Sequence, residues 1–531
     1  MKLALKVFLL VTTLQFALFA FITFRPFLLT PPNHTYTILT KNYYYPIFFY
    51  PNMILQGKDG FWGIKDPSTT QPQGRVLGQW FFILAGKAAL ILHAEPIYFY
   101  LILQAMGGLF VCIMTYIFIT MLLPELYQCI AILLALGMEI GPDFGTWKAS
   151  LDGSVATFRI FDLAHHTWGE ALGLLSLYLL IRAYKKITPF RLFGLFVSSL
   201  FSTAFLPTVM MTLGLLVYPA FLIWSFVTRT FKKLFIPIAV ASAAVILAAI
   251  QTKIAFTQAG FPWSQWSEIE KTWWVSSQIL IQYLESLSVY LPFVVLGLIA
   301  LPIRWKYLSS DTKLVLILLT CWVVVPILYI PISDKSFFPV ANLRLVDGTL
   351  YISAGIVSAI ALVEFLNLFH NVRIKTFLKT VIVSATIGIS VLLSATYLIP
   401  FVRSQGDGDP HAYPLTSTWK AIQFVKTLPI QSGLLVREPY GEIISGYADI
   451  RAYIGGTHGF PDWLGRQWLA IQFFTGTYSE QDARKFLKDN DISYVFYGPD
   501  EQSVTTIKPL YSFLLTPVFT TDSAIVFKVN K

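Results

Sequence analysis

Two aspartates stand in a polar, Gly-containing stretch that follows the first apolar segment of the chain. Asp59 lies in Gly57-Lys58-Asp59-Gly60, and Asp66 lies in Ile64-Lys65-Asp66-Pro67. A carboxylate can accept a proton from a reacting hydroxyl, and its oxygens are the ligands that Mg²⁺ prefers. Asp59 and Asp66 are therefore candidates for a general base or a metal ligand. The alternative for each is a solvated aspartate in a turn.

Cationic side chains stand near the starts of two apolar segments. Arg159 and His165 precede the run that begins at residue 167, and Arg344 precedes the run that begins at residue 348. Polar groups at the edge of lipid are costly unless they have partners or a task. An arginine can hold a phosphate through two parallel N–H donors, so these residues are candidate anion-binding groups. The alternative for Arg344 is a local ion pair with Asp347.

The composition indicates whether these side chains belong to a soluble protein or to a membrane protein. Apolar residues make up 55% of the chain and charged residues only 13%, against about 25% in soluble domains. The net charge of +10 does not indicate nucleic acid, because most Lys and Arg residues lie in short segments between apolar runs. The three cysteines lie inside apolar segments without metal-binding spacing. The chain is therefore predicted to be an α-helical polytopic membrane protein.

Crossing about 30 Å of hydrocarbon takes about 20 apolar residues in a helix. Eleven such runs occur, near residues 7–24, 95–123, 125–141, 167–184, 190–207, 208–228, 234–252, 285–303, 313–332, 348–368 and 378–400. We expect about eleven transmembrane helices.

Basic residues gather in alternate loops between these runs, which predicts that those loops and the N-terminus are cytoplasmic. An odd number of spans then puts the C-terminus outside the cytoplasm. If the apolar segment 77–93 were a twelfth span, every later loop would lie on the opposite side of the membrane, and the basic loops would no longer be cytoplasmic. We therefore predict an interfacial helix there, with Lys87 near the headgroups, within a long first exterior loop at 25–94.

The apolar density falls after residue 402, which predicts a transmembrane domain at 1–402 and an extracytoplasmic α/β domain at 403–531. Helices are expected at 418–427 and 481–490, strands at 432–437 and 492–497, and a terminal hairpin. No Gly-rich phosphate loop joins a strand to a helix, so nucleotide binding is not expected. The stretch 446–463, rich in Gly and aromatic residues, either covers a cavity or is a packed irregular loop.

This order of elements resembles the glycosyltransferase C superfamily. Short stretches of the tail are similar to those of poorly characterised bacterial membrane proteins within it: Ile444-Ser445-Gly446-Tyr447, residues 451–456, and Tyr494-Val495-Phe496-Tyr497-Gly498-Pro499-Asp500-Glu501. The resemblance implies a location in the bacterial cytoplasmic membrane and a polyprenyl-phosphate sugar as donor. It also implies that acidic residues of the first exterior loop act as base or metal ligand.

On this resemblance we expect inverting transfer of a hexose or pentose to an extracytoplasmic acceptor, which is a glycan, a lipid or a protein. Asp59 is the expected base, and Asp66 supports it or shares a divalent cation, Mg²⁺ or Mn²⁺, with it. Arg159, Arg344 and His165 are expected to bind the substrate phosphate.

Two other functions stay open from the sequence. A transporter or flippase of lipid-linked substrates would need internal repeats and broken helices, of which the sequence gives no sign. A non-catalytic member that binds a glycolipid or a partner protein is favoured by Lys41-Asn42, because the related proteins more often carry an acidic residue just before the tyrosines that follow.

Overall fold

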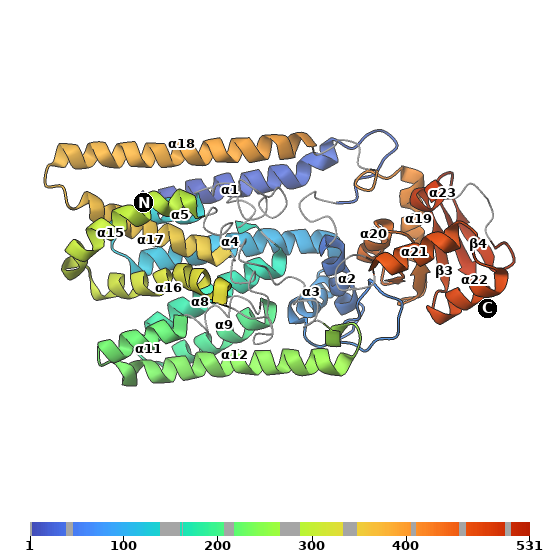
Figure 1. Ribbon diagram of the computed structural model, residues 1–531, viewed down its shortest axis with the longest axis horizontal. Coiled ribbons are helices and arrows are strands. Elements are labelled where there is room, and N and C mark those ends of the chain that lie inside the picture. The colour runs from blue at the N-terminus through green and yellow to red at the C-terminus, as the bar shows by residue number, and fades with distance from the viewer. Residues whose placement is uncertain are drawn as a thin grey trace. The chain divides into compact units, whose positions relative to one another are not determined.

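The computed structural model describes residues 3–38, 46–137, 160–161, 163–206, 217–265, 287–332, 348–404, 410–455, 463–504 and 511–530 (Figure 1). The chain divides into two compact units. Unit 1 contains residues 1–22, 103–252 and 270–402, and unit 2 contains residues 23–102, 253–269 and 403–531. The C-terminal part of the chain is thus grouped with residues 23–102, and the division at residue 402 stays a prediction.

Each of the eleven apolar runs coincides with a helix or with part of one. These helices are α1 (Leu3–Leu28), α4 (Pro96–Leu122), α5 (Glu125–Leu136), α8 (Ala164–Lys185), α9 (Pro189–Phe205), α11 (Tyr218–Val227), α12 (Phe231–Ala259), α15 (Leu291–Arg304), α16 (Ser310–Ile332), α17 (Gly348–Leu366) and α18 (Val372–Ser404). In the described part of the chain, α1, α4 and α12 are long and apolar enough to cross a membrane. The chain is a membrane protein, and the count of eleven crossings stays a prediction.

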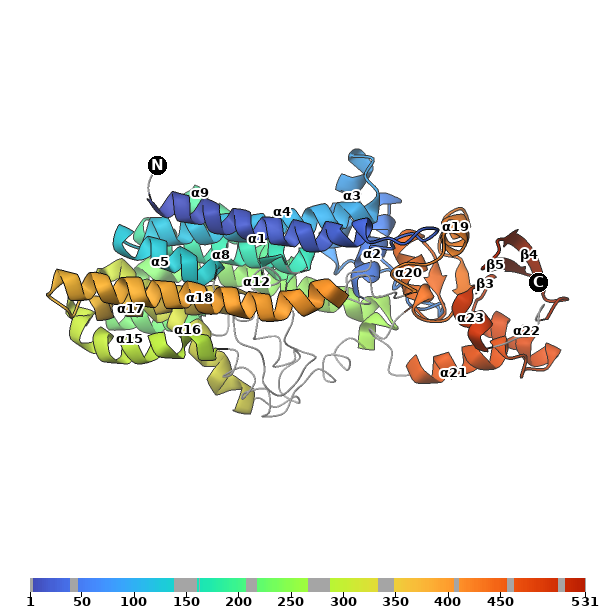
Figure 2. The ribbon, with the colours of Figure 1, turned by 90° about the horizontal axis from the view of Figure 1, so that it is seen from above.

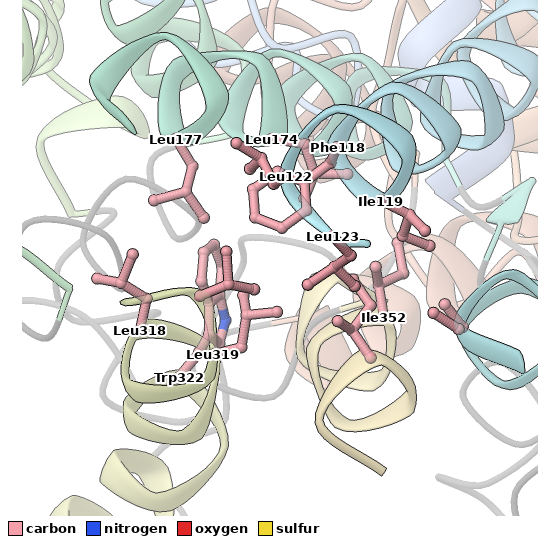
Figure 3. Close-up of a cluster of buried hydrophobic side chains, with 14 of the residues drawn as sticks. Phe118, Ile119, Leu122, Leu123, Leu174, Leu177, Leu318, Leu319, Trp322 and Ile352 are labelled. Carbon is pink, nitrogen blue, oxygen red and sulfur yellow. The ribbon is translucent and has the colours of Figure 1, made fainter. Parts of the chain in front are cut away.

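The core of unit 1 is a layer of aliphatic and aromatic side chains between helices that run side by side (Figure 2). Phe118 and Leu122 of α4 point toward Leu174 of α8, while Trp322 of α16 fills the space next to them (Figure 3). Phe118 and Trp322 are both fully buried. The helices of unit 1 are thereby held by shape complementarity, which is the main source of helix association in lipid.

Two short helices, α2 (Pro46–Lys58) and α3 (Trp80–Ile91), lie between α1 and α4 in the sequence. A helix of 12 residues rises only about 18 Å, which is too short to cross a bilayer. The Lys87 ammonium lies 5.0 Å from the ring of Trp62. The interfacial position of α3 stays a prediction.

Unit 2 contains a five-stranded sheet in the order β2-β1-β3-β5-β4. Its strands are β1 (Gly433–Leu435), β2 (Arg451–Ala452), β3 (Tyr494–Tyr497), β4 (Leu515–Thr520) and β5 (Ile525–Val529). Strand β1 pairs in parallel with β2 and β3, whereas β3–β5 and β5–β4 are antiparallel. The expected strands near 432–437 and 492–497 and the terminal hairpin are therefore present. Pro517 is accommodated because β4 is an edge strand with an irregular register at this point.

Five helices accompany the sheet: α19 (Thr416–Val425), α20 (Tyr440–Tyr447), α21 (Trp463–Phe474), α22 (Glu480–Asp489) and α23 (Pro499–Val504). The apolar sides of α21 and α22 contribute Phe473 and Phe486 to a core that also contains Val495 of β3. Ser479 caps α22, since its side chain accepts a hydrogen bond from the N–H of Asp482.

Candidate active site

Asp59 is held at the end of helix α2. Its backbone N–H donates to the carbonyl of Leu55 at 2.8 Å, so the helical hydrogen bonds continue to this residue. Gly60 follows with a φ of +102°, a conformation that favours glycine and commonly ends a helix. The carboxyl of Asp59 is therefore anchored at a helix end while its side chain stays exposed to solvent.

Asp449 lies between helix α20 and strand β2. Gln431 fixes it twice: the N–H of Gln431 donates to the Asp449 carbonyl at 2.5 Å, and Nε2 of Gln431 donates to Oδ1. Only 7% of Asp449 is exposed. This carboxyl is thus buried and firmly oriented, in contrast to that of Asp59.

Asn52 joins helix α2 to helix α20. Its Nδ2 donates to the carbonyl of Ser445 at 2.6 Å and to that of Ala448 at 3.1 Å. The carbonyls at the end of a helix lack donors from the helix itself, so the Asn52 amide satisfies two of them. Asp59 follows Asn52 by about two helical turns and therefore lies on the same side of α2. The contact made by Asn52 brings Asp59 next to Asp449.

The carboxyl of Asp59 lies within hydrogen-bonding reach of that of Asp449, and we call these two residues the carboxyl pair. Oδ2 of Asp449 is buried and receives no hydrogen bond from the residues that the structure describes. Two carboxyl groups approach each other favourably only when at least one carries a proton. Burial raises the pKa of Asp449 to about 6, and the charge of Asp59 contributes to this rise. Partial burial also raises the pKa of Asp59, whose side chain is still open to solvent on one side.

Arg75 supplies a fixed positive charge near the carboxyl pair. Its Nη1 donates to Oε1 of Gln56 at 3.0 Å and to the carbonyl of Gly63 at 2.9 Å. The guanidinium lies over the ring of Phe61, 3.5 Å from the centroid. The charge of Arg75 acts to lower the pKa of Asp449. Because these contacts already orient the guanidinium, it can stabilise an anion without further reorganisation.

Lys65 adds a second cation on the same segment. Its N–H donates to Oε1 of Gln56 and its carbonyl accepts from Nε2 of Gln56, both at 2.8 Å. Burial lowers the pKa of the Lys65 ammonium, and the charges of Arg451 and Arg75 lower it further. Cations that repel one another in this way are stabilised by a bound anion. Lys65 and Arg75 are therefore two cations close enough to act on each other.

Asp66 has partners different from those of Asp59. Its Oδ1 accepts a hydrogen bond from the N–H of Ser68 at 2.8 Å, and the side chain is buried near the charge of Arg466. Burial raises the pKa of Asp66 to about 6. The Arg466 guanidinium also donates to Oγ1 of Thr69 at 3.2 Å. These contacts fix the loop around Asp66 to helix α21.

Among the predicted phosphate-binding residues, the structure describes His165. Arg159 and Arg344 lie outside the described residues. His165 lies in the first turn of α8, in unit 1, where its ring centroid is 4.3 Å from that of His166. The roles of all three in phosphate binding stay predictions.

The described residues alone do not fit the expected divalent cation. Among them, no three His, Cys, Asp or Glu side chains are grouped so that they could hold a metal ion. Asp59 faces Asp449, whereas Asp66 accepts from Ser68 and lies near Arg466. A shared Mg²⁺ or Mn²⁺ between Asp59 and Asp66 thus has no set of ligands here, and the cation stays a prediction.

Asp449, Arg75 and Lys65 were not predicted as site residues. Asp449 lies in the stretch 446–463 that the sequence marks as unusual, but nothing there indicates a contact with Asp59. Lys65 and Arg75 flank the Asp66 loop, and Gln56 is the residue that brings both toward Asp59. A polar residue such as Gln56 inside an otherwise apolar helix is the signal that could have indicated this network.

No family model matches the sequence, and no curated protein is significantly similar to it. Solved structures are similar in fold. ArnT from Cupriavidus metallidurans, bound to undecaprenyl phosphate, aligns over 98% of this chain and 97% of its own, with a TM-score of 0.52 and 11% identity. The Archaeoglobus fulgidus oligosaccharyltransferase in the apo form aligns over 99% of this chain and 74% of its own, with a TM-score of 0.48 and 13% identity.

A further structure of the archaeal enzyme, AglB in complex with an inhibitory peptide and a dolichol-phosphate, covers 93% of this chain and 69% of its own, with a TM-score of 0.48 and 13% identity. The similarity to ArnT extends over nearly the full length of both chains. The chain therefore shares the fold of ArnT, in agreement with the fold that the resemblance to the glycosyltransferase C superfamily implies.

Proposed function

We propose that this protein is a glycosyltransferase that moves one sugar from a polyprenyl phosphate to an acceptor at the extracytoplasmic face of a bacterial cytoplasmic membrane. The observation that carries the proposal is the exposed carboxyl of Asp59, backed by Asp449 and adjoined by the cations Arg75 and Lys65, within one compact unit. A fold alone does not define an activity, so the proposal rests on this constellation.

The chemistry needs a proton acceptor and a positive charge. Asp59 accepts the proton of the acceptor hydroxyl while the oxygen of that hydroxyl attacks the anomeric carbon of the sugar. The bond from that carbon to the phosphate oxygen breaks on the opposite side, which inverts the configuration. Arg75 and Lys65 balance the charge on the departing polyprenyl phosphate. Arg159, Arg344 and His165 are proposed as further contacts to this phosphate.

The remaining assignments follow the topology expected from the sequence. Residues 1–402 span the membrane with a cytoplasmic N-terminus, and residues 403–531 lie outside the cytoplasm. The undecaprenyl phosphate bound to ArnT supports the same class of lipid here. The transferred sugar is a hexose or a pentose, and the acceptor is a glycan, a lipid or a protein.

The experiment uses the full chain in lipid nanodiscs with a panel of undecaprenyl-phosphate hexoses and pentoses. Release of undecaprenyl phosphate is measured by mass spectrometry, with water or added sugars as acceptor. We expect Asp59→Asn to reduce release by about 100-fold or more, as loss of a general base does, without a change in unfolding temperature. Asp522→Asn, in an exposed turn between β4 and β5, is the matched control and should retain full release.

Other outcomes would assign the protein elsewhere. Undiminished release by the Asp59→Asn protein would remove Asp59 from the mechanism. If no donor is turned over but a labelled lipid crosses the bilayer, the protein is a transporter. Binding of undecaprenyl phosphate without turnover of any donor would identify a non-catalytic binder.

A further inference from the structure

We propose that the C-terminal part of unit 2 binds the hydrocarbon chain of a single-chain amphiphile, a fatty acid with about ten to twelve carbon atoms. The binding site is a cavity of about 290 Å³ between helix α21 and strands β3, β4 and β5. The inference goes beyond the proposed sugar transfer and does not depend on it, because residues other than Asp59, Lys65 and Arg75 line the cavity.

The sheet supplies an apolar floor for the cavity. Val495 and Tyr497 of β3 lie two residues apart, so their side chains point to the same face of the sheet. In the antiparallel register Val495 pairs with Phe527 of β5 and Tyr497 pairs with Ile525, and residues that pair directly also share a face. All four side chains line the cavity. The alternation of the two strands therefore fixes an aromatic and aliphatic surface on this face.

Helix α21 and strand β4 complete the lining. Phe473 and Phe474 are fully buried at the end of α21, and both face the cavity. Leu515 and Pro517 of β4 contribute further apolar surface. The register between β4 and β5 is irregular between Pro517 and Phe519. The cavity thus lies beside the part of β4 where the regular pairing of the sheet is interrupted.

Ser512 and Thr520 give the cavity a polar edge. Both residues line the cavity and are exposed, so their hydroxyls lie where the cavity meets solvent. A hydroxyl can donate a hydrogen bond to a carboxylate. The carboxylate of a fatty acid can therefore lie at this edge while its chain lies among the apolar side chains. A mostly apolar cavity with a few polar groups is typical of sites for small molecules.

Volume and length together favour one chain. An apolar cavity of about 150 Å³ holds one benzene molecule, so a cavity about twice as large holds roughly twelve carbon atoms. The lining follows β4 from Leu515 to Thr520, a length of about 17 Å at the rise of a strand. A cavity that is long relative to its volume suits an extended chain better than a wide ring system. The two long chains of a membrane phospholipid would exceed this volume.

Hydrocarbon is a better occupant of this cavity than water. A buried water molecule needs several polar partners, whereas aromatic and aliphatic side chains form most of the lining. Apolar side chains around a void also lose dispersion contacts, which a hydrocarbon chain restores. Binding of the chain should therefore stabilise this part of unit 2.

The test uses the full chain in lipid nanodiscs and dodecanoate that carries a photoreactive diazirine in its chain. After irradiation, mass spectrometry of peptides locates the adducts. We expect saturable adducts on cavity residues such as Phe474 and Phe527, which excess unlabelled dodecanoate reduces about 10-fold. From octanoate to dodecanoate, competition at equal free concentration in the buffer should strengthen about fourfold per methylene, because each methylene adds a similar buried area. Longer acids should compete no better than dodecanoate.

Two variants at the polar edge test the location of the site. Ser512→Trp and Thr520→Trp each place an indole at the entrance, and both positions are exposed, so the fold can accommodate the larger side chain. Each variant should reduce the adducts on cavity residues by about 10-fold or more through steric exclusion, without a change in unfolding temperature. Lys485→Trp, at an exposed position of α22, is the matched control and should keep the adducts. A diazirine phospholipid should label the helices of unit 1 but not the cavity.

The outcomes separate this site from nonspecific labelling by lipid. Absence of adducts from the cavity residues, while unit 1 is labelled in the same sample, would overturn the inference. It would also be overturned by adducts that persist in both tryptophan variants, or by phospholipid that labels the cavity as strongly as dodecanoate does. If a tryptophan variant lowers the unfolding temperature, the other variant and the chain-length dependence decide. Adducts should also form in Asp59→Asn, so a failure of the proposed sugar transfer is distinguished from a failure of this site.

Discussion

Arg451 of strand β2 donates from Nη1 to the carbonyl of Thr70, between α2 and α3, at 2.6 Å. The same guanidinium donates from Nε to the carbonyl of Gln431 at 2.9 Å and from Nη2 to Oδ2 of Asp491 at 2.5 Å. One side chain thereby links three parts of unit 2 that are far apart in the sequence.

Replacing Arg451 should therefore destabilise unit 2. Lysine lacks the planar arrangement of donors that reaches three acceptors in different directions. We expect Arg451→Lys to lower the stability of unit 2 by about 2 kcal/mol, because buried acceptors lose their donors. Thermal unfolding of the purified protein measures this. Arg484→Lys is the control, because Arg484 is exposed and its contact with Glu480 is long, at 4.0 Å. An equal loss of stability in Arg484→Lys would contradict the argument.

The buried carboxyl of Glu501 should make the stability of the folded protein depend on pH. It is fully buried, with Oε1 accepting from the N–H of Arg437 at 2.7 Å and Oε2 accepting from that of Gly498 at 2.9 Å. Burial raises its pKa to about 7 in spite of these hydrogen bonds. A raised pKa in the folded state means that the contribution to stability is complete below about pH 4 and is lost as the pH rises through 7.

The loss between pH 5 and pH 8 should amount to about 2–3 kcal/mol for this one group. Unfolding temperatures measured at several pH values should therefore fall less steeply for Glu501→Gln than for the wild-type protein. Its absolute stability will be lower, because the amide cannot accept both hydrogen bonds. Glu480→Gln, at an exposed position, should keep the wild-type slope. A Glu501→Gln protein with that same slope would refute the assignment.

Asp66 should tolerate asparagine. The amide oxygen can still accept from Ser68, so we expect transfer activity within about 3-fold of the wild-type value and little change in stability. Alanine should cost about 1–2 kcal/mol, because the buried N–H of Ser68 loses its acceptor. Activity and unfolding temperature are measured together. A large loss of activity in Asp66→Asn without a change in unfolding temperature would instead support the predicted role of Asp66 beside the base.

Gly86 permits the close approach of α2 and α3. A Cβ at this position would lie 2.4 Å from the carbonyl oxygen of Ile54 and 2.6 Å from Cα of Gly57. Gly86→Ala should force the helices apart and destabilise unit 2 by about 1–3 kcal/mol. In Gly388→Ala the added methyl meets nothing within 4 Å, so thermal unfolding should be unchanged or raised slightly by the better helix propensity. Equal behaviour of the two variants would disprove the packing argument.

The eleven-span topology can be tested by cysteine labelling of intact cells. In a chain without its three native cysteines, Asp522→Cys should react with a membrane-impermeant maleimide, because residue 522 is expected outside the cytoplasm. Lys186→Cys should react only after permeabilisation, since basic loops remain inside. Reaction of both residues in intact cells would contradict the predicted odd number of spans between residues 186 and 522.

Hydropathy located the helices that coincide with the eleven apolar runs, because this signal is local. Each of these helices must itself supply the apolar surface that faces lipid or its neighbours. Alternation and turn residues located β3 and the terminal hairpin for the same reason. Helix α2 was not predicted, since Pro46, Pro51 and Gly57 interrupt its apolar pattern.

The candidate site depended on contacts that no local pattern records. Asp59 was predicted from its residue type and its neighbours in the sequence. Asp449 became its partner only through the docking of α2 on α20, which depends on the side chain of Asn52. Arg75 and Lys65 were overlooked because the search for cations followed the ends of apolar segments, whereas Gln56 orients both within the loop.

The hydrogen bond from Asn52 to Ser445 spans 393 residues of sequence, and this distance has a consequence for biogenesis. A ribosome that adds about 5–20 residues per second needs roughly 20–80 s to reach helix α20 after it has finished α2. During that interval the amide of Asn52 has no α20 carbonyl to which it can donate. The carboxyl pair therefore forms late in synthesis. A nascent or prematurely ended chain in the membrane would lack this pair.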